Sequence, residues 1–147
     1  MYKRQQKYRC GKRKKLVELG QEGTLISGVR VRQHKDYSFT WDMAEYASNK
    51  MSYIEIPRGF LSDTTELDAY RMSQVLTSNG QIGWIGGSGR PDVAAGHSII
   101  AGQYKDKKPD LITQCNLCVK QCKENSGVHR VWPIKPEDLR LVTFVDS

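Results

Sequence analysis

The stretch ELDAYRMSQVLTSNGQIGWIGGSGRPDV, residues 66–93, determines how the middle of the chain folds. Its apolar residues predict a helix over residues 64–85, and the sequence DTTE at 63–66 fits a capping box at the start of that helix. A second helix is expected over residues 91–103, because proline is favoured at the first helical position and an acidic side chain in the first turn.

Four glycines interrupt the second half of the first helix: Gly80, Gly83, Gly86 and Gly87. Each costs roughly 1 kcal/mol of helix stability relative to alanine. Their presence therefore predicts that a neighbouring backbone approaches the helix closely. A nucleotide-binding loop is not indicated, because such a loop follows a strand and opens a helix, whereas these glycines lie within a helix.

Shorter elements precede this stretch. Residues 24–32 and 37–41 contain alternating apolar and polar side chains, and the polar residues 33–36 between them suit a turn, which predicts a β-hairpin. Asp42 can cap a short helix over residues 42–51. Residues 53–56 then form a short strand or an extended link.

The elements that follow are a helix over residues 109–124 and two strand-like segments at 128–132 and 139–145. The last of these is the clearest strand in the sequence, and two prolines between the segments suit a turn. The order of hairpin, three-helix middle and strands predicts an α+β fold.

Three cysteines, Cys115, Cys118 and Cys122, lie at helical spacing on one apolar stripe of the 109–124 helix. With Cys10 or His129 as a fourth ligand they could be interpreted as a zinc site. A zinc knuckle needs a turn between its ligands, however, and free cysteine packs well as a small apolar residue. The pattern favours core packing, and the three histidines, His34, His97 and His129, are isolated from one another and indicate no catalytic site.

The charge of the 147-residue chain is concentrated at its start. The sequence contains 23 Lys plus Arg and 16 Asp plus Glu, a net charge of +7. Residues 1–15 carry eight basic and no acidic side chains, which leaves 15 basic against 16 acidic in the remainder. Such a segment can neutralise phosphates, and a solvated tail is the alternative.

Neither a membrane-spanning run of roughly 18 apolar residues nor a secretory signal is present in the sequence. We expect an intracellular protein, in a cytoplasmic particle or the nucleus, whose cysteines are free thiols or metal ligands. The sequence MYKRQ at residues 1–5 is similar to the translated end of a sequencing adapter, and residues 139–147 read as an interrupted strand. The chain is therefore expected to be a fragment cut at both ends.

Several of these segments together resemble the C-terminal part of a copia-type retrotransposon reverse transcriptase. The family has a Tyr-Arg pair near the start of a helix, matched by residues 70–71, then a glycine and an aromatic residue, matched by 83–85, and an R-P-D element, matched by 90–93. Residues 28–31 and 39–43 are similar to the stretch that follows the polymerase hairpin, although the usual glutamine is lacking. Residues 139–147 resemble the first strand of the attached RNase H domain.

The resemblance implies three regions in addition to the adapter-like residues 1–5. Residues 6–61 would form the end of the polymerase palm, and residues 62–127 the thumb and connection helices. Residues 128–147 would begin an RNase H-like domain. The implied fold is thus an α+β fragment of a larger protein, with the rest of the polyprotein as a partner.

The resemblance also implies which chemistry is absent. The family's polymerase site uses a Tyr-x-Asp-Asp hairpin with Mg²⁺, and this sequence contains no Asp-Asp dipeptide. Asp146 would correspond to the first RNase H carboxylate, a catalytic Mg²⁺ ligand only together with residues beyond Ser147. The parent protein would be an RNA-directed DNA polymerase, whereas this fragment is expected to be inactive alone.

The remaining role implied for a thumb is to hold the primer–template duplex through its phosphates, without regard to sequence. An ion pair with a neighbouring carboxylate is the alternative for Arg90. Candidate phosphate contacts are Lys12, Arg13, Lys14, Lys15, Arg90, Lys105, Lys107 and Lys108.

Two other functions remain open on the sequence. One is a small free-standing nucleic-acid-binding module, basic or zinc-binding. The other is a non-functional transposon relic that is unstable alone, because an unpaired apolar strand such as 139–145 tends to aggregate.

Overall fold

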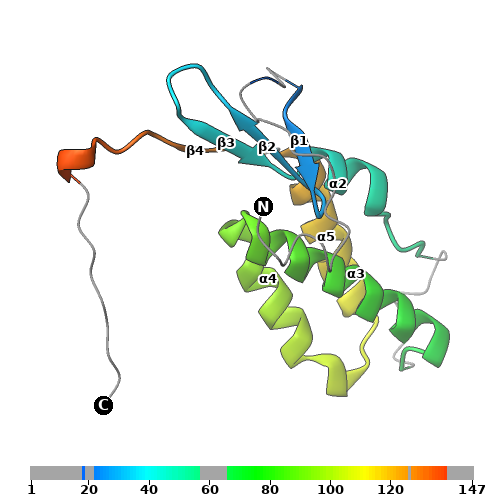
Figure 1. Ribbon diagram of the computed structural model, residues 1–147. Helices are drawn as coiled ribbons and strands as arrows, with labels where there is room; N and C mark the ends of the chain where they lie inside the picture. Colours follow the sequence, from blue (N-terminus) through cyan, green and yellow to red (C-terminus); the bar gives the residue numbers. More distant parts are fainter. Residues whose placement is uncertain (1–17, 19–21, 57–65, 126, 139–147) are drawn as a thin grey trace, which may run out of the picture.

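The structure, a computed structural model, describes residue 18 and residues 22–56, 66–125 and 127–138 of the chain. In these ranges the fold is α+β, as predicted. Figure 1 shows a sheet at one end of a layer formed by the longer helices. The strands are β1 (Thr24–Ile26), β2 (Val29–Gln33), β3 (Phe39–Asp42) and β4 (His129–Val131); the helices are α2 (Ala44–Lys50), α3 (Ala69–Ser88), α4 (Pro91–Gly102) and α5 (Asp110–Glu124), with 3₁₀ turns η3 (Tyr104–Asp106) and η4 (Pro136–Asp138).

The sheet is antiparallel, with strand order β1-β2-β3-β4. The predicted hairpin is confirmed for β2 and β3, whose connection is closed by the His34 N–H donating to Ser38 O at 2.8 Å. The expected single strand over residues 24–32 is wrong. It divides at Ser27 and Gly28, which both have positive φ, as a tight two-residue hairpin turn requires.

The predicted strand at 128–132 is confirmed as β4, and it pairs with β3 in the same sheet as the hairpin. His129 lies opposite Trp41 in the register, and their rings stack with centroids 5.4 Å apart. The domain boundary expected between residues 127 and 128 therefore lies directly before β4, a strand of the same sheet as the hairpin.

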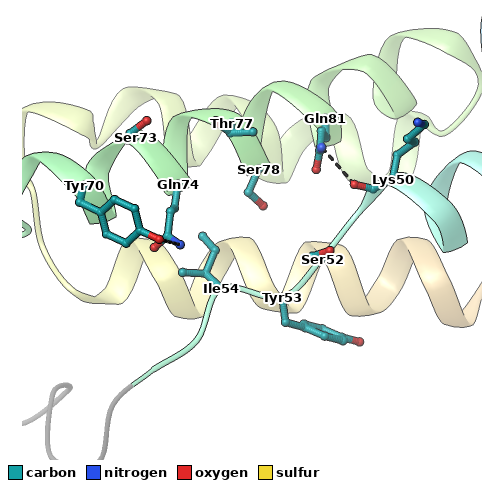
Figure 2. Close-up of a pocket in the computed structure, with 10 residues that line it drawn as sticks. All are labelled: Lys50, Ser52, Tyr53, Ile54, Tyr70, Ser73, Gln74, Thr77, Ser78 and Gln81. Atoms are coloured by element: carbon teal, nitrogen blue, oxygen red, sulfur yellow. Dashed lines mark hydrogen bonds between the residues drawn. The ribbon is translucent and has the colours of Figure 1, made fainter.

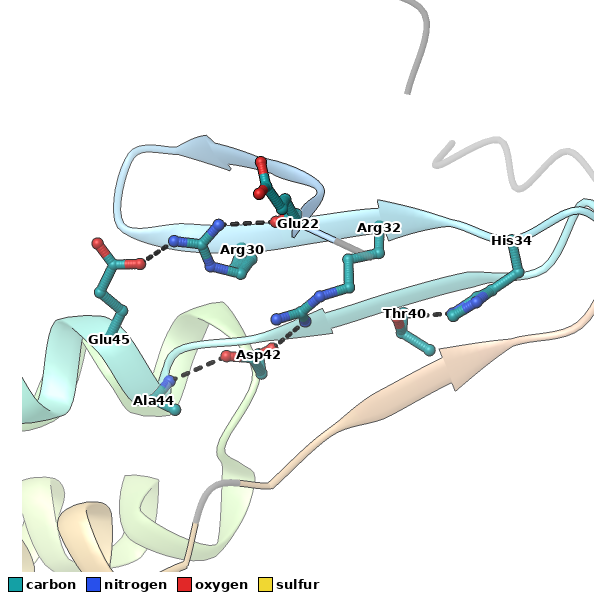
Figure 3. Close-up of polar contacts among 8 residues, drawn as sticks. All are labelled: Glu22, Arg30, Arg32, His34, Thr40, Asp42, Ala44 and Glu45. Carbon is teal, nitrogen blue, oxygen red and sulfur yellow. Dashed lines mark hydrogen bonds and ion pairs between the residues drawn. The ribbon is translucent and has the colours of Figure 1, made fainter. Parts of the chain in front are cut away.

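One face of the sheet carries arginines that are matched by carboxylates (Figure 3). Arg30 pairs with Glu45 of α2, and Arg32 pairs with Asp42. Asp42 also accepts from the Ala44 N–H at 3.2 Å, but the N-cap of α2 is Met43, which makes no side-chain capping bond, so the predicted capping by Asp42 is wrong. Asp42 is buried, and its ion pair with Arg32 supplies the partner that a buried carboxylate needs.

Helix α3 begins five residues later than expected. Residues 66–68 are not helical, and Asp68 supplies the cap by accepting from the Arg71 N–H at 2.7 Å. The helix then continues through all four glycines to Ser88. Residues 63–65 of the expected capping box and the expected strand at 139–145 lie outside the described residues.

Helices α4 and α5 match the predictions to within one residue, and the link over 51–56 is extended rather than a strand. The buried apolar side chains lie between the helices, in a core shared by α2, α3, α4, α5 and the link. The most fully buried members are Met51, Val75, Ile82, Ile85, Val93, Ile100, Leu111, Ile112, Cys115, Val119 and Cys122.

Candidate nucleic-acid interface

Three of the predicted phosphate contacts, Lys105, Lys107 and Lys108, are exposed in the connection between α4 and α5. This connection lies at the end of the helical layer away from the sheet (Figure 1). It is tied to the residues before α3, because the Leu67 N–H donates to Lys107 O at 2.7 Å. The backbone of Lys107 therefore lies beside the residues that precede α3, and its Nζ is 3.8 Å from the exposed carboxylate of Glu66.

Arg90 occupies a different environment. Its guanidinium is buried and donates twice to Asp92, from Nε at 2.8 Å and from Nη2 at 2.7 Å. Further bonds run to the carbonyls of Asn125 and Gln121 at the end of α5. The hydrogen bonds between the Arg90 and Asp92 side chains lower the pKa of Asp92 and raise the pKa of Arg90. The structure thus shows the ion pair that was the alternative for Arg90, with donors that connect α4 to α5, and gives no support to a phosphate contact at this residue.

The other predicted site residues, Lys12, Arg13, Lys14, Lys15 and Asp146, lie outside the described residues. The structure consequently brings together only the three lysines of the α4–α5 connection.

The cysteines of α5 pack into the core, as their spacing on one apolar stripe of the helix predicted. Cys115 and Cys122 are buried in the core, and desolvation raises the pKa of each to about 11. Cys118 is partly buried, and its pKa is also raised by desolvation. In the ranges that the structure describes, no group of three or more His, Cys, Asp or Glu could hold a metal ion.

The three histidines lie apart, as expected. His34 contacts the Thr40 hydroxyl at 3.0 Å, and His129 stacks on Trp41. His97 lies between α3 and α4, with Nδ1 at 3.0 Å from the Asn79 carbonyl. Each of the three thus contacts a different part of the fold: a neighbouring strand, helix α3 or the Trp41 ring.

Two of the four glycines of α3 explain how closely α4 packs. A Cβ at Gly86 would lie 3.1 Å from the backbone Cα of Ala94, and a Cβ at Gly83 would lie 2.7 Å from the His97 ring. The predicted close approach of a neighbouring backbone is confirmed at Gly86, while at Gly83 the neighbour is a side chain.

The other two glycines of this helix, Gly80 and Gly87, lie on a different side of α3. Among the described residues, a Cβ at Gly80 or Gly87 would meet nothing within 4 Å. They belong to the outer face of α3, defined here as the exposed residues of the helix after its first turn: Ser73, Leu76, Thr77, Gly80, Trp84 and Gly87. Sequence reasoning missed this face, although the spacing of Gly80, Trp84 and Gly87 is a signal that could have found it.

The composition of the outer face is unusual for a surface helix. Helix α3 has 20 residues without a single Asp or Glu, and its one basic residue, Arg71, pairs with Asp68. The Trp84 side chain is 45% exposed, and Leu76 is also exposed. A carboxylate-free ridge with an exposed indole and two open glycines can be approached closely by a large, flat or polyanionic partner.

A second exposed apolar area lies between α4 and α5. It is a groove of about 270 Å³ lined by Ile99, Leu117 and Cys118 among others, almost without polar atoms. Its chemistry suits an apolar side chain and offers nothing to a phosphate.

In the part of the chain that the structure describes, no helix has the length and apolar composition needed to cross a membrane. Comparison with protein-family models, with curated proteins and with solved structures finds no match for this chain.

Proposed function

We propose that this chain is the C-terminal part of a copia-type retrotransposon reverse transcriptase and that it binds the primer–template duplex. Its residues would form the end of the palm, the thumb and connection, and the start of an RNase H-like domain. The polymerase carboxylates and their Mg²⁺ belong to the rest of the parent protein, so the fragment contributes binding and no catalysis. The motif resemblance at residues 70–93 and the properties of α3 support this proposal.

The observation that carries the proposal is the outer face of α3. A helix that lies against nucleic acid must not present carboxylates to the phosphates, and α3 has none. Gly80 and Gly87 each cost roughly 1 kcal/mol of helix stability, and no packing contact within the described residues requires them. A glycine that no internal neighbour explains is accounted for when an external partner approaches the backbone at that point.

The lysines of the α4–α5 connection would add the electrostatic attraction. Lys105, Lys107 and Lys108 are exposed near the start of α3, where they can neutralise phosphates and release counterions. None of these contacts distinguishes one base from another. Duplex binding is therefore expected to be independent of sequence and steeply dependent on salt.

The test is fluorescence anisotropy of the 147-residue chain with labelled blunt duplexes of two unrelated sequences over a series of salt concentrations. We expect equal affinities at each salt concentration. Trp84→Ala should weaken binding about tenfold, the effect of losing a central aromatic contact. Replacing the three lysines by alanine should reduce the slope of log K against log salt by up to about 3.

Trp132→Ala is the matched control, because Trp132 is 61% exposed and lies beyond β4, away from α3. This variant should bind like the unchanged chain. Discrimination between the two duplexes at constant salt, or equal losses from Trp84→Ala and Trp132→Ala, would contradict the proposal.

A further inference from the structure

A polar groove runs along α3 beside its outer face, between the helix and the extended link at 51–56 (Figure 2). Its volume is about 280 Å³, close to the lower limit of ordinary ligand sites. Ser73 and Thr77 belong both to the outer face of α3 and to the wall of the groove. The groove is therefore continuous with the surface proposed to bind the duplex.

Hydrogen bonds hold the far wall of the groove in place. The Ile54 N–H donates to Asn116 Oδ1 at 2.8 Å, and Asn116 Nδ2 donates back to Ile54 O at 2.9 Å, which fixes the link to α5. Gln81 Nε2 donates to Lys50 O at 3.1 Å and closes the other end (Figure 2). Because both walls are anchored, the groove is formed before any ligand arrives.

Figure 2 shows Tyr70 at one end of the groove and Lys50 at the other, with hydroxyl and amide side chains of α3 between them. None of the described residues that line the groove carries a carboxylate. The Tyr53 ring points away from α3, and Lys123 Nζ lies 5.4 Å from its centroid. Tyr70 is thus the aromatic ring available to a ligand, and its side chain is largely exposed.

One group in the groove lacks a proper partner. The Ser78 side chain is buried and points from α3 toward the link, yet its Oγ makes no hydrogen bond of normal geometry. Its neighbour is the Cys115 thiol, which is only a weak partner. A buried hydroxyl without a partner is uncommon, but this Oγ is closed off from the open groove, so the groups that a ligand can reach are the more exposed Ser73, Gln74 and Thr77.

We propose that this groove binds an unpaired nucleotide of a single strand that continues from the duplex on α3. The base stacks on Tyr70, the neutral hydroxyl and amide groups bond to sugar and base edges, and Lys50 attracts the phosphate. An aromatic platform, a cation and the absence of carboxylates are the combination that single-strand sites use. This assignment rests on the proposed function, because the strand reaches the groove from the duplex surface.

The experiment compares a blunt duplex with the same duplex carrying a short 5′ or 3′ overhang, each titrated against the 147-residue chain. We expect one of the overhangs to raise the affinity about tenfold, the gain from stacking one base. Tyr70→Ser should abolish this gain and leave the affinity for the blunt duplex unchanged. Gln74→Ala should reduce the gain, by about threefold, through loss of one hydrogen bond.

Tyr37→Ser is the matched control, since Tyr37 is 70% exposed against 72% for Tyr70 but lies in the β2–β3 turn, away from the groove. This variant should keep the full gain. Binding of the blunt duplex with no gain from either overhang, or an equal gain in Tyr70→Ser, would overturn the groove assignment and leave the proposed function standing. Failure of the blunt duplex to bind would overturn the proposed function itself, and the groove assignment with it.

Discussion

Helix α3 has glycines on two of its sides, and the surroundings of the glycines differ between these sides. On the inner side, Gly86 lets the backbone of Ala94 approach, and a Cβ there would lie 3.1 Å from its Cα. On the outer side, Gly80 and Gly87 have open space where a Cβ would be. The first glycine is explained by the fold and the other two are not. The comparison teaches that a glycine with no internal neighbour points to a partner outside the described structure.

The largest effect is expected from filling the inner side. Gly86→Leu should lower the free energy of unfolding by about 3 kcal/mol, because the added side chain meets the backbone of Ala94 and cannot be accommodated by a rotamer change. Urea unfolding measures it. Gly80→Leu is the matched variant and should gain roughly 1 kcal/mol, since leucine is the better helix former and nothing obstructs it. Equal losses of stability in Gly86→Leu and Gly80→Leu would show that the inner and outer sides of α3 do not differ in packing.

The next effect concerns binding at the outer side. Gly80→Leu and Gly87→Leu should each weaken binding of a blunt duplex about tenfold, roughly 1.4 kcal/mol, by holding the partner away from the helix. Stability and affinity would then change in opposite directions in the same variant. Anisotropy titration measures the affinity, and Leu117→Gly on the exposed side of α5 is the control. Unchanged affinity in both glycine variants would mean that the duplex does not approach this face.

The smallest effect concerns the ion pair that connects the packed helices. Arg90 lowers the pKa of Asp92, so the pair contributes stability above the unfolded value of about 4, and this contribution is lost as the pH falls through the lower folded value. The Asp92 side chain is 45% exposed, which limits the contribution to a few tenths of a kcal/mol after screening. Asp92→Asn should therefore flatten the decline in stability between about pH 4 and pH 2. Urea unfolding over this pH range checks it, and parallel curves would contradict it.

Much of the helical layer could be predicted from the sequence because strong local signals mark its ends. Pro91, Pro109 and the Asn-Ser-Gly sequence after Glu124 punctuate α4 and α5. The start of α3 could not be predicted as well, since Asp63 and Asp68 are both followed by helix-compatible residues and only the structure shows that Asp68 caps. The β1–β2 turn was missed because it places a serine at positive φ, which alternation of side chains does not reveal.

The candidate site was predictable only in part. Lysines in a loop are exposed almost by default, which made Lys105, Lys107 and Lys108 easy to choose. The pair of Arg90 with a neighbouring carboxylate was an open alternative on the sequence, whereas its bonds to carbonyls at the end of α5, more than 30 residues away, could not be predicted. The outer face of α3 has readable spacing, but which face stays open depends on how α4 and α5 pack against the helix.

The measurement that tests the central claim most directly is hydroxyl-radical footprinting of the full chain, with and without a blunt duplex, read by mass spectrometry. Trp84 and Trp132 are both exposed and serve as internal probes of two surfaces in one sample. If the duplex lies on the outer face of α3, it should strongly reduce the oxidation of Trp84 and Leu76 and leave that of Trp132 unchanged. Unchanged oxidation of Trp84 in a saturated complex would contradict the account.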